Sequence, residues 1–340
     1  MKVCQIMAGD EEGGLEKHFV EMSNGLLDYV DQVVVIGHEK YRQRFLPRVH
    51  FISLDLSCSR RNLFMLFHLI KILRQEAPDV IHAQANKAVD ILNSIRKFVP
   101  GFKVGTVHGK KKNLAMYTGM HTVIGVSKGA VFGFKHPDVR VVYNGIPSSS
   151  DNAYSRKTLV ERFSLNPALH ITLSVGRLVH VKAFDNLINA WQPEFGHLLI
   201  VGDGSEKIKL ERLIQQRGLT GLVVLGGFCT DVRQMMSAAD LLVFSSHREG
   251  FSYVLAEALL SRLPVLSTRV PGAEELLPEH FLVKVNDIDE LSQSLRRVLA
   301  NLPETVRLQS YLFDWASQTL TLQNMLSATA AIYRDLLERG

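Results

Sequence analysis

The chain has 340 residues, of which 46% are hydrophobic and 21% charged, and its formal net charge is +5. This length allows two domains with complete cores, and this composition excludes a disordered chain. No apolar run approaches the roughly 20 residues that a membrane-spanning helix needs. The first apolar segment ends before Asp10, which is too early for a signal peptide, so it is expected to be a strand.

Strand-like apolar runs alternate with amphipathic helical patterns in the first half of the chain, which is typical of βα units and a parallel sheet. Strands are predicted at residues 2–7, 33–37, 49–54, 79–82, 103–108, 122–126 and 140–142, and helices at 15–29, 62–75 and 88–98. Ser127 follows a predicted strand and is expected to cap a helix.

Residues 147–167 are rich in Ser, Asn and Pro, as linkers are, and a second alternating series follows them. Strands are predicted at residues 171–175, 197–201, 222–225, 241–245 and 264–268, and helices at 184–191, 206–217, 232–239 and 319–337. The predicted fold is α/β, with two Rossmann-like doubly wound domains facing across a cleft. The expected divisions are residues 1–150, residues 151–318, and a C-terminal helical segment, 319–340, that crosses back to the first domain.

The charge distribution indicates the kind of binding partner, and the cysteines indicate the redox state of the compartment. Residues 57–135 contain 13 Lys or Arg but only three Asp or Glu, so this part favours phosphate-bearing partners such as nucleic acid or an anionic membrane surface. Cys4, Cys58 and Cys229 are far apart and form no C-x-x-C pair, which favours reduced thiols in the cytoplasm over a disulfide or zinc framework.

Glycines and cations follow several predicted strands. Gly14 and its neighbour Gly13 follow the first strand, and Gly202 follows a strand of the second domain; such glycines allow a ligand near the backbone, or build a tight turn. Arg177 and Lys182 follow another strand, where two cations suit a diphosphate; an exposed basic loop is the alternative.

Glu249 and Glu257 are eight residues apart in an apolar segment. On one helix this spacing corresponds to about 12 Å, comparable to the distance between the sugar and the ribose of a nucleotide-sugar. Carboxylates accept hydrogen bonds from hydroxyl groups, and the helix N-terminus near Gly250 and Ser252 would face the diphosphate.

The ordered set of motifs resembles the GT4 family of retaining glycosyltransferases, which have the GT-B fold, and the resemblance covers nearly the whole chain. The set is Gly13-Gly14-x-Glu16, His108-Gly109, Val126-Ser127, Asn144-Gly145-Ile146, Gly176-Arg177-Leu178 with Lys182, Gly202-Asp203-Gly204, Asp240, and Glu249-x7-Glu257 with Pro264-Val265.

The resemblance implies a role for each matched residue. Arg177 and Lys182 would bind the donor diphosphate and Glu257 the ribose. Glu249 would hold the donor sugar, together with the backbone at Gly250, Phe251 and Ser252. His108 would lie beside the reacting carbon. His108 and Glu249 would be the catalytic residues. Gly14 would open the acceptor-side loop and approach the donor, and Gly202 would allow close backbone approach.

A metal site is not expected. Asp287-Ile288-Asp289 matches the D-x-D motif that binds a metal and a nucleotide-sugar in a different fold of glycosyltransferase. Here Glu290 lies three residues after Asp287, a spacing that predicts a capping box at a helix start. The resemblance likewise implies no cofactor and no divalent metal.

The expected function is metal-independent transfer of a sugar from a nucleotide-sugar, with UDP as the expected nucleotide, to a glycan or glycolipid acceptor. Lipopolysaccharide core or another surface glycan is the expected product, made in the cytoplasm or on the inner face of the cell membrane. Lys110, Lys111 and Lys112 could meet a phosphorylated acceptor or anionic lipid, or form a solvated loop. One alternative is a polyanion- or nucleic-acid-binding protein, although no RNA-binding signature is present and no nucleic acid partner is expected. Another is a GT-B enzyme such as a sugar-nucleotide epimerase.

Overall fold

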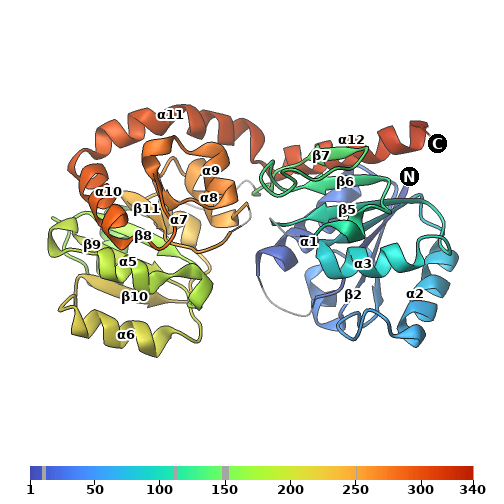
Figure 1. Cartoon of the computed structure of the whole chain (residues 1–340), viewed down its shortest axis with the longest axis horizontal. Coiled ribbons are helices and arrows are strands. Elements are labelled where there is room, and N and C mark those ends of the chain that lie inside the picture. Colours follow the sequence, from blue (N-terminus) through green and yellow to red (C-terminus); the bar gives the residue numbers. More distant parts are fainter. Residues whose placement is uncertain (10–12, 110–112, 148–152, 250, 340) are drawn as a thin grey trace. The chain divides into compact units, whose positions relative to one another are not determined.

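The chain forms two compact units in the computed structural model, which describes residues 1–9, 13–109, 113–147, 153–249 and 251–339. Unit 1 comprises Met1–Pro147 and Thr321–Gly340, and unit 2 comprises Ser148–Leu320 (Figure 1). The C-terminal segment therefore returns to the first unit, as expected from the sequence.

Unit 1 contains a fully parallel sheet in the order β3-β2-β1-β4-β5-β6-β7. Its strands are β1 Lys2–Met7, β2 Gln32–Gly37, β3 His50–Ser53, β4 Val80–Gln84, β5 Phe102–Val107, β6 Thr122–Gly125 and β7 Val139–Val141. Most are apolar at successive positions because helices cover both faces of a parallel sheet. The strand order reverses between β1 and β4, and ligands bind at such switch points, beyond the carboxyl ends of the strands.

The α-helices of unit 1, within the described residues, are α1 Gly14–Gly25, α2 Leu63–Glu76, α3 Ala85–Ile95 and α12 Leu322–Arg339. Helix α3 packs on β4, β5 and α2, whereas α1 packs on β1 and α12. The predicted helix at residues 15–29 is α1 followed by a 3₁₀ turn, Leu26–Asp28.

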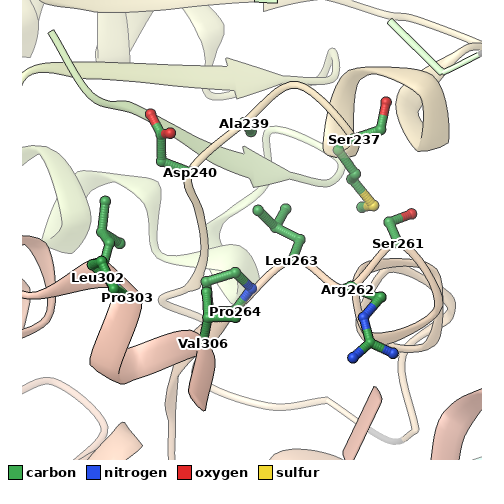
Figure 2. Close-up of a pocket in the computed structure, with 11 residues that line it drawn as sticks. Ser237, Ala239, Asp240, Ser261, Arg262, Leu263, Pro264, Leu302, Pro303 and Val306 are labelled. Carbon is green, nitrogen blue, oxygen red and sulfur yellow. The ribbon is translucent and has the colours of Figure 1, made fainter. Parts of the chain in front are cut away.

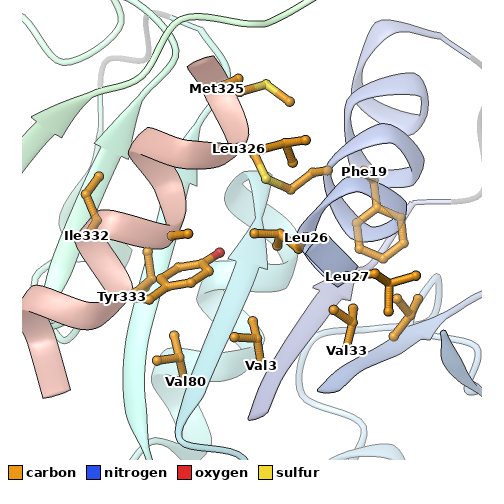
Figure 3. Packing of buried hydrophobic residues seen from close by; sticks show 14 of the residues in the cluster. Val3, Phe19, Leu26, Leu27, Val33, Val80, Met325, Leu326, Ile332 and Tyr333 are labelled. Carbon is orange, nitrogen blue, oxygen red and sulfur yellow. The ribbon is translucent and has the colours of Figure 1, made fainter. Parts of the chain in front are cut away.

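Helix α12 completes the core of unit 1. Its residues Met325, Leu326 and Tyr333 are buried and point toward α1 and strands β1 and β4 (Figure 3). Burial of each side chain of this size stabilises the fold by about 1.5–3 kcal/mol. This burial explains why the segment after Thr321 belongs to unit 1 although it follows unit 2 in the chain.

The start of α12 is fixed by a β-bridge between Ile146, near the end of the first part of unit 1, and Thr321. Leu322 donates its backbone N–H to the carbonyl of Ile146 at 2.9 Å. A Cβ at Gly145 would lie 2.5 Å from the carbonyl oxygen of Thr321, so a side chain there would collide with the backbone. Gly145, which the sequence placed in a turn, lies instead in irregular backbone and allows the close approach that the returning segment needs.

Unit 2 contains a second parallel sheet, in the order β10-β9-β8-β11-β12-β13, which reverses between β8 and β11. Its strands are β8 Ile171–Val175, β9 His197–Val201, β10 Val223–Gly227, β11 Leu241–Phe244, β12 Val265–Thr268 and β13 Leu282–Val283. Its α-helices are α4 Arg156–Phe163, α5 Phe184–Ala190, α6 Lys207–Gln216, α7 Val232–Met236, α8 Tyr253–Leu260, α9 Pro271–Leu276, α10 Ile288–Ala300 and α11 Leu302–Thr319. Helix α5 packs on α6 and α10, and α8 packs on α7 and α11.

One local expectation is wrong. Ser127 caps no helix, since the described residues between β6 and β7 form turns. Its hydroxyl accepts a hydrogen bond from the backbone N–H of Ala130 at 3.1 Å. An N-cap residue makes the same bond to the amide three residues later, but here no helix follows among the described residues before β7.

Candidate functional site

The loops that follow β8 and β11 meet at the switch point of unit 2. The hydroxyl of Ser245 donates to the carbonyl of Lys182 at 2.9 Å, and the backbone N–H of His247 donates to the carbonyl of Val181 at 2.9 Å. The hydroxyl of Thr268, at the end of the next strand, β12, donates to the carbonyl of Ser246 in the loop after β11 at 2.7 Å. These bonds hold both loops at the position where open α/β sheets bind ligands.

Lys182 and Glu249 form an ion pair in these loops, between Nζ and Oε1, with side chains only 18% and 15% exposed. The hydroxyl of Ser246 donates to the same carboxylate oxygen at 3.1 Å. Two residues that the sequence assigned to different ligand groups are therefore direct partners. A pair of this kind needs both charges, because a single remaining charge would lie largely removed from water.

The glycine loop after β9 lies against the loop after β8. A Cβ at Gly202 would lie 1.9 Å from the carbonyl oxygen of Gly176, and the φ of Gly202 is +146°. The backbone N–H of Leu178 donates to the carbonyl of Asp203 at 2.8 Å. Gly202 thus brings the two loops together, while the side chain of Arg177 between them is exposed.

Glu249 does not lie on the helix that carries Glu257, contrary to our expectation. Helix α8 begins at Tyr253, with Ser252 as its N-cap residue, so Glu249 lies in the preceding loop and the 12 Å helical spacing does not apply. Among the described residues, no amide donates a capping bond to the Ser252 side chain. Glu257 is half-buried within the helix. Ser252 itself was the signal for this boundary, since serine is favoured at N-caps.

The remaining predicted residues of this segment differ in placement. Phe251 is almost fully buried, so its side chain packs in the interior of unit 2. Gly250 lies outside the described residues, as do the three lysines at 110–112.

In unit 1, His108 follows β5, and its Nε2 atom lies 2.9 Å from Oε1 of Gln84, the last residue of β4. Because a carbonyl oxygen can only accept, Nε2 of His108 carries the proton in this arrangement. Burial lowers the pKa of His108 well below its usual value, and the neighbouring His18 and His82 lower it further. His108 is therefore neutral near pH 7 and cannot act there as a charged acid.

Two histidines without a distinctive sequence signal lie near His108. The ring of His18 packs edge-on against that of His108 with 4.8 Å between centroids. Burial lowers the pKa of His18 to about 4 and that of His82 to about 3. Sequence reasoning missed Gln84 altogether. The available signal was polar residues at alternate positions of a fully buried strand, since unsatisfied polar groups are costly there.

Gly14 is the first residue of α1 and is exposed. Gly9 and Gly13 both lie near the buried carboxylate of Glu16, since a Cβ at Gly9 or Gly13 would lie 3.4 or 3.5 Å from its oxygens. Helix α1 follows β1, so Gly14 lies on the segment that leaves the switch point of unit 1.

A surface pocket of about 340 Å³ in unit 2 is lined by none of the predicted site residues Arg177, Lys182, Gly202 and Glu249. It is lined by residues such as Asp240, which precedes β11, and Pro264, which precedes β12, with Leu302 and Val306 of α11 (Figure 2). It thus opens at the amino ends of the strands, opposite the ends where ligands bind in this class of sheet.

The D-x-D segment caps a helix, as predicted. Oδ1 of Asp287 accepts the backbone N–H of Glu290 at 2.9 Å at the start of α10. In a capping box the Glu290 carboxylate would accept the backbone N–H of Asp287. Here it accepts the backbone N–H of Lys284 instead. No group of three or more His, Cys, Asp and Glu side chains suited to a metal occurs among the described residues. Over the same residues, no helix is long and apolar enough to cross a membrane.

Two family models match the chain. Residues 2–122 match "Glycosyl transferase 4-like", and residues 155–313 match "Glycosyl transferases group 1". HepE from Anabaena, whose crystal structure contains UDP, superposes with a TM-score of 0.83 at 20% identity over 98% of this chain and 100% of its own.

Two relatives from Rhizobium meliloti (strain 1021) align over almost the whole chain. The lipopolysaccharide core biosynthesis glycosyltransferase LpsE is 26% identical, with 99% of both chains covered. The similarly named LpsD is 27% identical, with 100% of this chain and 99% of its own covered. With a family match in each unit and two parallel-sheet units, the chain belongs to the GT4 family of glycosyltransferases and has the GT-B fold.

Proposed function

We propose that this glycosyltransferase moves a sugar from a UDP-sugar to a glycan or glycolipid acceptor, with retention and without a divalent metal, in lipopolysaccharide core or other surface glycan synthesis. The observation that carries the proposal is the Lys182–Glu249 pair at the switch point of unit 2. The names of LpsE and LpsD support the product class, and the UDP complex of HepE supports the nucleotide.

In unit 2, Lys182 and Arg177 bind the donor diphosphate and the first turn of α8 faces it. A cation and a helix N-terminus both favour a phosphate group. Glu249, beside Lys182, accepts hydrogen bonds from the sugar hydroxyls, while Glu257 does the same for the ribose. Gly202 keeps the neighbouring backbone close enough to complete this side of the site.

The proposed reaction proceeds on one face of the sugar. The bond from the anomeric carbon to the diphosphate breaks while the acceptor oxygen bonds to the same face of that carbon. The departing phosphate oxygen takes the acceptor's proton. Lys182 and Arg177 stabilise the charge that grows on the diphosphate, which is where electrostatic stabilisation contributes most. His108 assists beside the reacting carbon as a neutral group, through its ring or its backbone carbonyl.

Product stereochemistry and chelation test the reaction class. With a UDP-sugar and an acceptor glycan, we expect NMR to show the donor's anomeric configuration in the product. We also expect the rate in EDTA to equal the rate without it, because the proposed charge stabilisation comes from Lys182 and Arg177. A known metal-dependent transferase in the same buffer serves as the control for chelation. An inverted product, or a rate lost in EDTA and restored by a divalent cation, would contradict the proposal.

A second surface supports a membrane-linked acceptor. The outward side of α2, here called the α2 face, carries Leu63, Phe64 and Phe67 at 77%, 90% and 71% exposure. Lys71 and Arg74 are exposed on the following turns. The opposite side of the helix is buried, so α2 has a second apolar face beside cations. We propose that the α2 face contacts an anionic bilayer surface.

Replacing Phe64 and Phe67 with Ser should lower binding to vesicles containing anionic lipid at least about tenfold, because each ring loses its burial among the acyl chains. Co-sedimentation at fixed salt measures this. Ile208→Ser is a matched control, since Ile208 is 64% exposed on α6 of unit 2. Equal vesicle binding by the double variant and the wild type would contradict a membrane contact through the α2 face.

A further inference from the structure

The helix that returns to unit 1 is joined to His108 by buried hydrogen bonds. The hydroxyl of Tyr333 on α12 accepts from Nε2 of Gln5 at 2.9 Å. Oε1 of Gln5 accepts from Nε2 of Gln84 at 3.0 Å, and Oε1 of Gln84 lies 2.9 Å from Nε2 of His108. Tyr333, Gln5 and Gln84 are almost completely buried.

This chain of bonds has one direction. Each glutamine donates through its nitrogen on one side and accepts through its oxygen on the other. The hydroxyl of Tyr333 accepts from Gln5, so its own proton is available for Nδ1 of His82, 2.5 Å away. The amide of Gln5 is thereby oriented, the amide of Gln84 follows, and its oxygen faces His108.

The surroundings make this polar chain costly unless it is complete. Tyr333 lies in the hydrophobic core cluster of unit 1, with Val3 and Val80 of the adjoining strands (Figure 3). Buried polar groups in such a core must find partners, and a broken network costs more than an apolar replacement. A buried run of four polar residues that ends at a proposed catalytic residue is therefore a specific arrangement rather than an incidental one.

The backbone beside Gln84 supports the same conclusion. Gln84 occupies the N-cap position of α3, yet among the described residues its side chain caps no helix amide. The next residue, Ala85, has φ +65°, a left-handed conformation that is unfavourable for a residue with a Cβ. Neither the missing cap nor the φ of Ala85 stabilises α3. Both are consistent with a Gln84 side chain that bonds to His108 instead of to the helix. Local strain of this kind gathers at functional sites.

We propose that Tyr333 is a positioning residue for sugar transfer: through Gln5 and Gln84 it fixes the ring of His108 in the tautomer protonated at Nε2. The C-terminal helix thus orders a group of the reaction although it touches no substrate. The inference rests on the proposed role of His108 beside the reacting carbon.

Tyr333→Phe removes the hydroxyl and keeps the ring, so Nε2 of Gln5 loses its partner at 2.9 Å and keeps only the longer contact with Nδ1 of His82 at 3.4 Å. We expect kcat to fall about tenfold with the donor KM unchanged, since a misplaced group lowers the rate without weakening donor binding. The ring ¹⁵N shifts of His108 should change from a single Nε2-protonated tautomer in the wild type to a mixture of tautomers in the variant.

Tyr117→Phe is the matched control. Tyr117 is equally buried in unit 1, and its hydroxyl lies 2.8 Å from Oδ1 of Asn86 and 3.1 Å from the carbonyl oxygen of Thr106, outside the chain of bonds that reaches His108. We expect this variant to lose stability but to keep the wild-type kcat and the wild-type His108 shifts.

The outcomes separate this inference from the proposed function. If His108→Ala transfers sugar at the wild-type rate, the ring of His108 has no part in the reaction; the positioning role of Tyr333 is then overturned, and the proposed function keeps only the backbone carbonyl at this position. If His108→Ala is inactive but Tyr333→Phe keeps both kcat and the ¹⁵N shifts, the positioning role alone is overturned. Equal losses of kcat in Tyr333→Phe and Tyr117→Phe would also overturn it, because general loosening would explain both.

Discussion

Replacing Lys182 with Met is expected to lower sugar transfer by about 10²–10³-fold, since one positioned group that stabilises developing charge contributes that much in other enzymes. Initial rates with saturating donor measure the loss. Lys209→Met is a control: Lys209 also pairs with carboxylates, Asp185 and Glu206, but its side chain is 58% exposed on α6. That variant should transfer sugar at the wild-type rate.

A double variant separates chemistry from stability. Lys182→Met leaves the Glu249 carboxylate without its cation, and Glu249→Gln leaves Lys182 without its anion, so each single change should cost roughly 1–3 kcal/mol of unfolding free energy. Combining them removes both charges and should restore part of that stability. If the double variant also regained transfer, the pair would be structural only, and the proposed donor roles would be wrong.

Gly202→Ala is expected to destabilise unit 2 by about 2–6 kcal/mol, because strained backbone and forced overlap each cost roughly 1–3 kcal/mol. The new Cβ would lie 1.9 Å from the carbonyl oxygen of Gly176, at a φ of +146°. Denaturant unfolding followed by circular dichroism measures the change. We also expect weaker donor binding, since the loops after β8 and β9 must move apart.

Gly218→Ala provides the comparison for that variant. Gly218 also has a positive φ, +65°, but a Cβ there would meet nothing within 4 Å among the described residues. Its cost should be limited to about 1 kcal/mol for the backbone conformation. Equal losses in the two variants would show that conformation alone, and not the contact with Gly176, explains the effect at Gly202.

Much of the fold could be predicted because buried parallel strands have a clear pattern. The ranges predicted for β1, β8 and β9 agree with the structure at both ends. The failure at Ser127 has a physical reason: a serine hydroxyl can accept from the amide three residues later in a turn as well as in a helix. Local sequence does not distinguish the two.

The site was predictable in its residue types but not in its contacts. The sequence identified Lys182 and Glu249 separately, whereas their pairing depends on β8 and β11 being neighbours in the sheet. Placing Glu249 on a helix ignored the N-cap preference of Ser252. The contact between Gln84 and His108 joins β4 to the loop after β5, and Tyr333 comes from the end of the chain. Such long-range contacts leave no local pattern.

Thermal unfolding with added nucleotide-sugars tests the central claim most directly. A ligand at about 100 times its Kd stabilises the folded state by about 2.7 kcal/mol, which should raise the Tm of a unit of this size by about 5 °C or more. We predict this rise for a UDP-sugar, smaller rises for GDP- and ADP-sugars, and no rise for Lys182→Met with any of them. A wild-type Tm unchanged by every nucleotide-sugar, or an equal rise in Lys182→Met, would contradict a donor site built around Lys182 and Glu249.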